Sequence, residues 1–278
     1  MKSAIFKTLK KALSSLGIQI SLSQSKKNLA NRKGKKNLNV GCGKYIIDGF
    51  ISLDIYTEHY HRNRKRDFIE YDLRKDRLPF PDNSVDNIYI SHVIEHVETD
   101  YVVIFMRESH RVLKTGGVLR IACPDAEFLW RVSRFDNEYW TWRKGLIEKG
   151  INKLRDKMLN SPKSLPSQMD FFIREVSTPR SAYEGNSIET IIINGNDIKD
   201  LSYDQALNLL TEGLSFRVNH PGQHINAWDF SRLKNLGEEA GFKFIIKSKP
   251  NGSISSAMQG TDMDRTHPEM SLYVDMLK

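Results

Sequence analysis

Two glycines and two aspartates mark the part of the sequence with the residue types and spacing for ligand chemistry. Gly41 and Gly43 directly follow the short apolar segment 38–40, and Asp54 and Asp72 follow later segments. Glycine has no Cβ atom, so backbone amides at Gly41 and Gly43 can approach a ligand closely. Carboxylates accept hydrogen bonds from hydroxyl and amino groups. The pattern predicts a ligand site built from backbone amides and acidic side chains.

Apolar and helical segments alternate over residues 37–125, and they must position these side chains. Segments 38–40, 50–54, 85–90 and 118–122 predict strands, and a 3.6-residue period predicts a helix over 99–113 that Thr99 caps. Such alternation predicts a mostly parallel sheet with helices on both faces. Because the carboxyl ends of parallel strands share one edge, the polar residues that follow the strands predict a ligand crevice there.

The glycine loop differs from two common nucleotide-binding loops. A G-x-G-x-x-G loop needs a glycine where Ile46 stands, and the Gly-Lys-Ser/Thr of a P-loop is absent. Other motifs occur in order: the loop at 38–43, Asp54, Asp72-Leu73, Leu78-Pro79-Phe80, Ser91 to His96, and Arg111 to Gly117. In this order they resemble the class I S-adenosylmethionine (SAM)-dependent methyltransferases. More narrowly, the chain is similar to predicted methyltransferases of bacterial surface-glycan gene clusters.

The resemblance implies a Rossmann-like α/β fold and SAM as the cofactor. Asp54 would accept hydrogen bonds from the ribose hydroxyls and Asp72 from the adenine amino group, with Leu73 packed on the ring. The resemblance places the sulfonium near the end of the fourth strand. The full set of predicted cofactor-binding residues is Gly41, Gly43, Asp54, Asp72, Leu73, Ser91 and His92.

The first motif departs from the family in two ways. Asn39 stands where the family has an acidic residue, which weakens its assignment to the SAM amino group. The short spacing between Gly43 and Asp54 leaves room for about one helical turn. We therefore expect the first helix to be reduced. The N-terminal helix could instead cover the face of the sheet on which that first helix would have packed.

The alternation stops after Asp125, which predicts three parts in the chain. Residues 37–125 and 221–278 are expected to form the SAM-binding α/β domain. Residues 126–220 are mostly helical and rich in aromatic and basic residues, and we expect them to form a cap over the substrate. Trp130, Trp140 and Trp142 would either stack on an acceptor or pack inside the cap. Residues 1–36 form the third part, a basic arm with an amphipathic helix and a tether.

The net charge of +8 belongs to this arm. Residues 1–36 hold ten of the 42 Lys and Arg and none of the 34 Asp and Glu. An amphipathic helix ending near Gly17 would either lie on an anionic membrane through residues 1–20 or dock on the body. No apolar stretch is long enough to span a bilayer, and two cysteines form no disulfide framework. We expect a cytoplasmic protein, or one peripheral at the inner membrane face, and make no prediction of its oligomeric state.

These features together predict a SAM-dependent O-methyltransferase. Its acceptor is expected to be a small molecule or a glycan, including a lipid-linked sugar, and its role to lie in polysaccharide biosynthesis. A histidine near the crevice would take the proton from the acceptor hydroxyl. The candidates are His92, His220 and His224, although each could equally be a structural histidine. O- and N-methylation remain open alternatives.

Three other functions fit parts of the sequence. One is a non-catalytic adaptor that keeps the SAM fold, which the intact glycine and aspartate positions disfavour. Another is an RNA methyltransferase with Cys123 as nucleophile, but the Pro-Cys motif it needs is absent, so nucleic acid is not the expected partner. The third is a zinc hydrolase, because residues 92–96 match H-x-x-E-H. That pattern requires a fully helical context, whereas His92 follows a strand, so we predict no metal.

Overall fold

The computed structural model describes residues 29–56, 68–135, 138–148, 167–182 and 191–278. Seven strands within these ranges form one sheet in the order β3-β2-β1-β4-β5-β7-β6. The predicted helix at 1–20 lies outside the described residues. The strands are β1 (Asn37–Val40), β2 (Ile51–Asp54), β3 (Ile69–Glu70), β4 (Val85–Ser91), β5 (Leu113–Pro124), β6 (Phe244–Lys247) and β7 (Ser271–Leu277).

The strand order reverses at the centre of the sheet. The chain runs outward from β1 through β2 to β3, then returns to place β4 on the other side of β1. All of these strands are parallel, and only β7 runs antiparallel to its neighbours β5 and β6. Ligands of open α/β sheets bind outside the carboxyl ends at such a reversal. The predicted Rossmann-like class I methyltransferase fold is confirmed.

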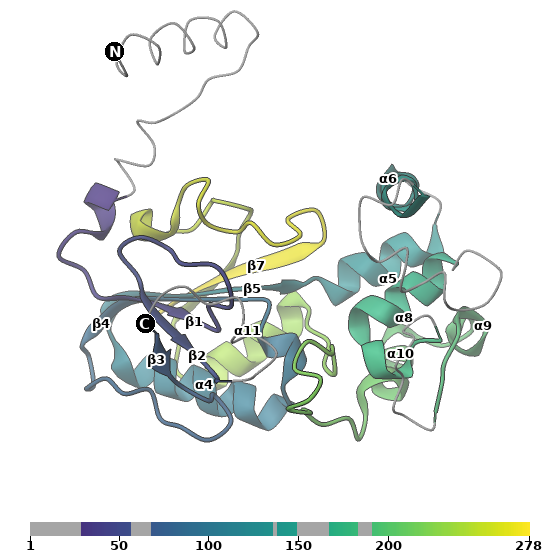
Figure 1. Cartoon of the computed structure of the whole chain (residues 1–278), viewed down its shortest axis with the longest axis horizontal. Helices are drawn as coiled ribbons and strands as arrows, with labels where there is room; N and C mark the ends of the chain where they lie inside the picture. The colour runs from purple at the N-terminus through teal and green to yellow at the C-terminus, as the bar shows by residue number, and fades with distance from the viewer. Residues whose placement is uncertain (1–28, 57–67, 136–137, 149–166, 183–190) are drawn as a thin grey trace, which may run out of the picture.

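Helices α4 (Thr99–Val112) and α11 (Phe230–Glu239) cover one face of the sheet (Figure 1). A hydrophobic cluster lies between the sheet and these helices. It contains Ile88, Ile90 and Leu119 of the strands, Phe105 of α4 and Leu233 of α11. Helix α4 begins at Thr99, as predicted, but Glu98 is its N-cap residue. The Thr99 hydroxyl instead accepts a hydrogen bond from the Asn226 side chain, so the predicted Thr99 cap is wrong.

The opposite face packs against the segment between β6 and β7. This segment contains the 3₁₀ helix η3 (Ser256–Met258), and Met258 and Met263 contact Tyr89 and Val118 of the sheet in a second hydrophobic cluster.

A buried ionic group fastens this segment to the sheet. Arg120 of β5 is fully buried and donates hydrogen bonds to Asp264 at 2.6 Å and to Asp275 of β7 at 2.9 Å. It also donates to the backbone oxygen of Lys249. Separating one partner of a buried ion pair leaves an uncompensated charge, which is costly. Arg120, Asp264 and Asp275 therefore keep the segment in one position on the sheet.

The connection between β1 and β2 is a series of turns without a helix, so the predicted one-turn helix is wrong. Asn39 stabilises this connection, since its side-chain amide donates to the backbone oxygen of Tyr45 at 3.0 Å. This contact explains an asparagine at the first motif. Part of the predicted tether is also packed on the body, because Arg32 is buried and bound to Asp262 at 2.6 Å.

Residues after Asp125 form a group of helices beside the sheet (Figure 1). The group comprises α5 (Ala126–Arg134), α6 (Glu138–Glu148), α8 (Gln168–Val176), η2 (Thr178–Arg180), α9 (Gly195–Ile198) and α10 (Tyr203–Thr211). Leu129, Phe172 and Leu207 belong to a hydrophobic cluster of their own. Trp130 packs on Phe172 with ring centres 5.2 Å apart. The predicted capping box at Ser202 is present. A substrate-binding role for this group stays a prediction.

Within the part of the chain that the structure describes, no helix has the length and apolar character needed to cross a bilayer.

We predict that Glu108→Gln lowers the free energy of unfolding by roughly 2–3 kcal/mol at pH 7. Glu108 of α4 accepts hydrogen bonds from Arg111, Arg77 and the backbone of Leu78. The hydrogen bonds from Arg111, above all, lower its pKa from 4.5 to about 2. This stabilisation is therefore complete above about pH 5 and is lost as the pH falls towards 2.

Urea unfolding of both proteins between pH 7 and pH 3 tests this prediction. Asp82→Asn is the matched control, because Asp82 also binds Arg111 at 2.6 Å but is 68% exposed. We expect it to cost less than about 1 kcal/mol. A Glu108→Gln deficit that stays constant across this pH range would contradict the prediction.

Candidate functional site

A cavity of about 410 Å³ opens at the carboxyl ends of the central strands. It lies where the strand order reverses, between the loop after β1 and the residues after β4. All seven predicted cofactor-binding residues line it: Gly41, Gly43, Asp54, Asp72, Leu73, Ser91 and His92. The sheet therefore brings together residues from four separate segments, although their individual roles remain predictions.

The two loop glycines serve different purposes. Both have positive φ, 66° at Gly41 and 51° at Gly43, which glycine adopts without strain. A Cβ atom on Gly41 would lie 2.2 Å from a methyl carbon of Val93, so Gly41 allows the loop to pack against the residues after β4. A Cβ atom on Gly43 would meet no atom within 4 Å. A side chain at position 43 would therefore extend into the cavity, and glycine keeps that space open.

Asp54 ties the glycine loop to the end of β2. Its carboxylate accepts hydrogen bonds from the backbone amides of Gly43 and Ile55, both at 2.7 Å. An ionised carboxylate has about four acceptor positions. Asp54 can thus hold the loop in place and accept hydrogen bonds from ligand hydroxyls, which suits the predicted ribose contact.

Asp72 is paired with a residue that the sequence analysis did not identify. Arg74 donates two hydrogen bonds to the Asp72 carboxylate, at 2.9 and 2.7 Å. Burial alone would raise the pKa of Asp72, but these hydrogen bonds and the Arg74 charge outweigh it and hold the pKa below 3.8. The Arg74 guanidinium also lies 3.8 Å from the ring centre of Phe216. Phe216 lines the cavity, so the segment after α10 completes its wall.

His92 occupies a strained position at the end of β4. Its φ is 54°, in the left-handed region that few residues other than glycine adopt. Its backbone amide donates to the oxygen of Ala122, which fixes the residue against β5. The side chain lies between two groups, with Nδ1 3.1 Å from Glu95 Oε1 and Nε2 2.9 Å from the Ser271 hydroxyl.

Glu95 is the second residue that sequence reasoning missed as part of the site. It lies on the 3₁₀ helix η1 (Ile94–His96) and is 1% exposed. Burial acts to raise its pKa, but contact with His92 and the nearby His96 outweighs burial and lowers the pKa to about 2. Glu95 is thus an ionised carboxylate inside the protein. The sequence signal that could have identified Glu95 is its position within the Ser91–His96 motif.

His220 and His224 do not line the cavity, although their neighbour Pro221 does. His224 packs against His96, with ring centres 5.0 Å apart, and His96 borders the cavity. The chain segment returning from the helical group therefore reaches the site, as predicted. Of the three candidate bases, the structure brings only His92 to the cavity wall.

Two alternative functions lose support from the geometry. The H-x-x-E-H segment is not one helix, because His92 ends the β4 region in a left-handed conformation and only Ile94–His96 form a 3₁₀ turn. The histidine pair of an inverted zinc protease is therefore not formed. Cys123 is completely buried, and burial raises the pKa of its thiol well above 9.0. This environment is opposite to that of a nucleophilic cysteine.

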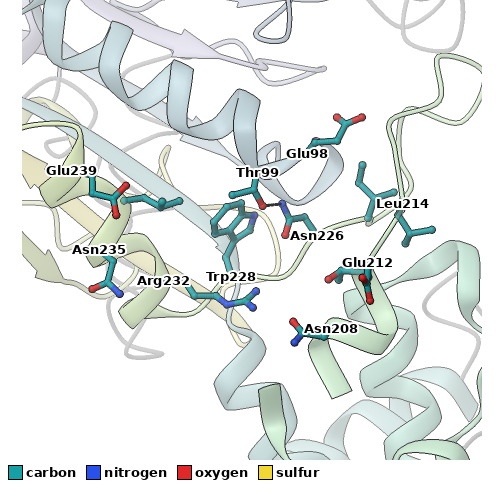
Figure 2. A pocket seen from close by; sticks show the side chains of 13 residues that line it. Glu98, Thr99, Asn208, Glu212, Leu214, Asn226, Trp228, Arg232, Asn235 and Glu239 are labelled. Carbon is teal, nitrogen blue, oxygen red and sulfur yellow. Dashed lines mark hydrogen bonds between the residues drawn. The ribbon is translucent and has the colours of Figure 1, made fainter. Parts of the chain in front are cut away.

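A second cavity, of about 720 Å³, lies between α4, α10 and α11 (Figure 2). Its wall carries the carboxylates Glu98, Glu212 and Glu239, and Figure 2 shows the hydrogen bond between Asn226 and Thr99 at its centre. It contains neither the glycine loop nor Asp54 and Asp72. Despite its larger volume, it lacks the features of a nucleotide-type site.

The residues of the smaller cavity fit SAM chemically. The open space at Gly43 suits an amino-acid group, and two carboxylates suit ribose hydroxyls and an adenine amino group. The predicted approach of loop amides to the ligand is wrong for Gly41 and Gly43, because their amides already donate to Leu53 and Asp54. Leu73, Val93 and Val97 supply apolar surface for a ring. The volume is within the range of small-molecule sites.

Part of the chain matches a family of known proteins. Residues 38–121 match the family model of a methyltransferase domain. Similar solved structures include SAM-dependent methyltransferases from Thermotoga maritima, Archaeoglobus fulgidus and Mesorhizobium loti. Their sequence identities are 12%, 12% and 16% and their TM-scores 0.41, 0.42 and 0.39. The alignments cover 91%, 98% and 88% of this chain and 89%, 94% and 91% of those chains. No curated protein matches the chain.

The fold and the cavity agree with the match of residues 38–121 to a methyltransferase domain. The matched region ends at Ile121, within β5, so it contains the cofactor site and excludes the helical group after Asp125. SAM is accordingly its cofactor, and the acceptor is a separate question.

We predict that alanine at Gly41 and alanine at Gly43 have different effects. Gly41→Ala should cost roughly 2–4 kcal/mol of stability, because positive φ is strained and the new methyl group clashes with Val93. Gly43→Ala should cost only about 1 kcal/mol. Its methyl group enters the cavity, so binding of S-adenosylhomocysteine should weaken by about tenfold. Urea unfolding and titration calorimetry measure the two effects, and equal stability losses would contradict the prediction.

Proposed function

We propose that the protein transfers a methyl group from SAM to an oxygen of a small-molecule or glycan acceptor. The observation that carries this proposal is the contact between His92 and the buried, ionised Glu95 at the cavity wall. Methyl transfer to a hydroxyl requires removal of a proton, and a histidine held by a carboxylate is suited to that task.

The Glu95 carboxylate favours the His92 tautomer with its hydrogen on Nδ1, since that nitrogen lies 3.1 Å from Glu95 Oε1. Nε2 then carries the lone pair that accepts a proton. The Ser271 hydroxyl lies 2.9 Å from Nε2 and donates to the backbone oxygen of His267, so an acceptor hydroxyl would have to take its place beside this nitrogen. As the proton arrives, the negative charge of Glu95 stabilises the imidazolium that forms.

The other side chains of the cavity position the reactants. SAM, when bound, supplies a methyl group already activated by the positive sulfonium. Gly43, Asp54 and Asp72 hold one partner at a fixed place relative to His92, and such alignment contributes several kcal/mol to catalysis. Phe216 closes the wall on the side of the helical group and limits access of water.

A glycan acceptor is the more specific form of this proposal. The ordered motifs resemble those of methyltransferases from surface-glycan gene clusters, and the segment that follows the helical group reaches the cavity wall through Phe216 and Pro221. The basic residues of segment 1–36 would hold the enzyme near a lipid-linked sugar at an anionic membrane.

We predict that His92→Asn lowers the turnover number by roughly 10²–10⁴-fold, the usual contribution of a general base. Asparagine is chosen because it tolerates the left-handed backbone at this position. Binding of S-adenosylhomocysteine, measured by calorimetry, should change little. His110→Asn makes the same change on α4 outside the cavity and should leave turnover within about twofold of wild type.

The acceptor is tested by measuring release of S-adenosylhomocysteine with surface polysaccharide, its oligosaccharides and lipid-linked sugars of the source cell. We expect turnover with at least one of these, and a methyl ether in the product by mass spectrometry and NMR. Methylation confined to nitrogen or to RNA would overturn the proposal. Full turnover in His92→Asn would overturn the assignment of the base.

A further inference from the structure

Three side chains with metal-ligand chemistry converge beside the cofactor cavity. They are Glu95 and His96 of η1 and His224 of the segment after α10. Each of these three described residues offers one ligand atom, and the three atoms all lie within 4.8 Å of one another. They come from parts of the chain more than 120 residues apart, so the fold alone assembles them.

The hydrogen bonds of the two histidines leave their ligand nitrogens available. Nδ1 of His96 lies 2.9 Å from the backbone oxygen of Gln223, and Nδ1 of His224 contacts the backbone oxygen of Glu175. A carbonyl oxygen only accepts hydrogen bonds, so each Nδ1 must carry the hydrogen. Each Nε2 then has a free lone pair. Metal-binding histidines characteristically donate their other N–H to a carbonyl or carboxylate in this way.

Glu95 places a buried negative charge beside these lone pairs. Both of its oxygens are closed to solvent. Nδ1 of His92 lies 3.1 Å and Nε2 of His96 3.9 Å from Oε1. A buried carboxylate approached closely by one imidazole leaves most of its acceptor positions unfilled, which is costly inside a protein. A cation between Glu95, His96 and His224 would satisfy the carboxylate and both nitrogens.

The backbone holds the ligands in place before any cation binds. The amides of Ile225 and Asn226 donate to the backbone oxygen of Glu95, at 2.8 and 3.1 Å. This contact joins the residues adjoining His224 directly to η1.

We propose that Glu95, His96 and His224 form a binding site for a divalent first-row transition cation, with zinc as the first candidate. Two imidazoles and one carboxylate are a common zinc ligand set, and three protein ligands leave coordination positions open. This proposal differs from the absence of a metal expected from the sequence. It also uses a different set of residues from the H-x-x-E-H pattern, because His92 is replaced by His224.

Metal titration tests the site without any acceptor. Protein treated with a chelator and dialysed is titrated with zinc chloride by calorimetry and with cobalt chloride by visible absorption. We expect about one cation per chain, and cobalt bands from nitrogen and oxygen ligands. Glu95→Gln and His224→Asn should each weaken binding by at least about tenfold. His220→Asn, a change in the same segment outside the cluster, should bind as wild type does.

Several results would overturn the site. The first is absence of metal binding to the wild-type chain. The second is a metal affinity of Glu95→Gln and His224→Asn that equals the wild-type affinity. The third is a loss of affinity in His220→Asn as large as the loss in those two variants. Binding of S-adenosylhomocysteine, measured separately, shows whether each variant is folded. If both variants fail that check, NMR of the wild-type histidines decides, because zinc must shift the His96 and His224 ring signals and unchanged signals overturn the proposal. Metal binding and methyl transfer can thus fail independently.

Discussion

The parallel pairing of β1 with β4 is the constraint on which the site depends. These strands are aligned so that Val40 lies opposite Ile90. Gly41, the first residue after β1, therefore lies beside Ser91, the last residue of β4. The close approach of Gly41 to Val93 then locks the two loops together. Because the chain turns away in opposite directions on the two sides of this pair, the space between the loops remains open for a ligand.

Two carboxylates with different surroundings lie at the cavity and behind its wall. Asp54 lines the cavity and accepts from the backbone amides of Gly43, in the glycine loop, and of the adjacent Ile55. Glu95 lies among His92, His96 and His224, of which His92 and His96 line the cavity. One carboxylate thus accepts from backbone donors, and the other is surrounded by imidazoles. The proposed proton transfer would take place beside the second carboxylate.

The central fold and the cofactor region follow from local sequence patterns. Apolar runs that end in glycine or aspartate define the strands and their carboxyl ends, so Gly43, Asp54 and Asp72 are identifiable without coordinates. Arg74 has no such signal, because its role depends on Phe216, which lies about 140 residues further along the chain. His224 is similar, since only the tertiary fold brings it to His96. Contacts between segments distant in sequence are set by packing, which a single sequence does not display.

The placement of β7 between β5 and β6 affects the order in which this protein can fold during synthesis. Strand β6 has no other partner in the sheet, and Arg120 stays without one of its two aspartates until Asp275 is made. A nascent chain that has emerged only as far as residue 270 would therefore expose the edge of β5 and leave Arg120 with Asp264 as its one acidic partner. Completion of the sheet must wait until β7 has left the ribosome, which makes this a late step of folding.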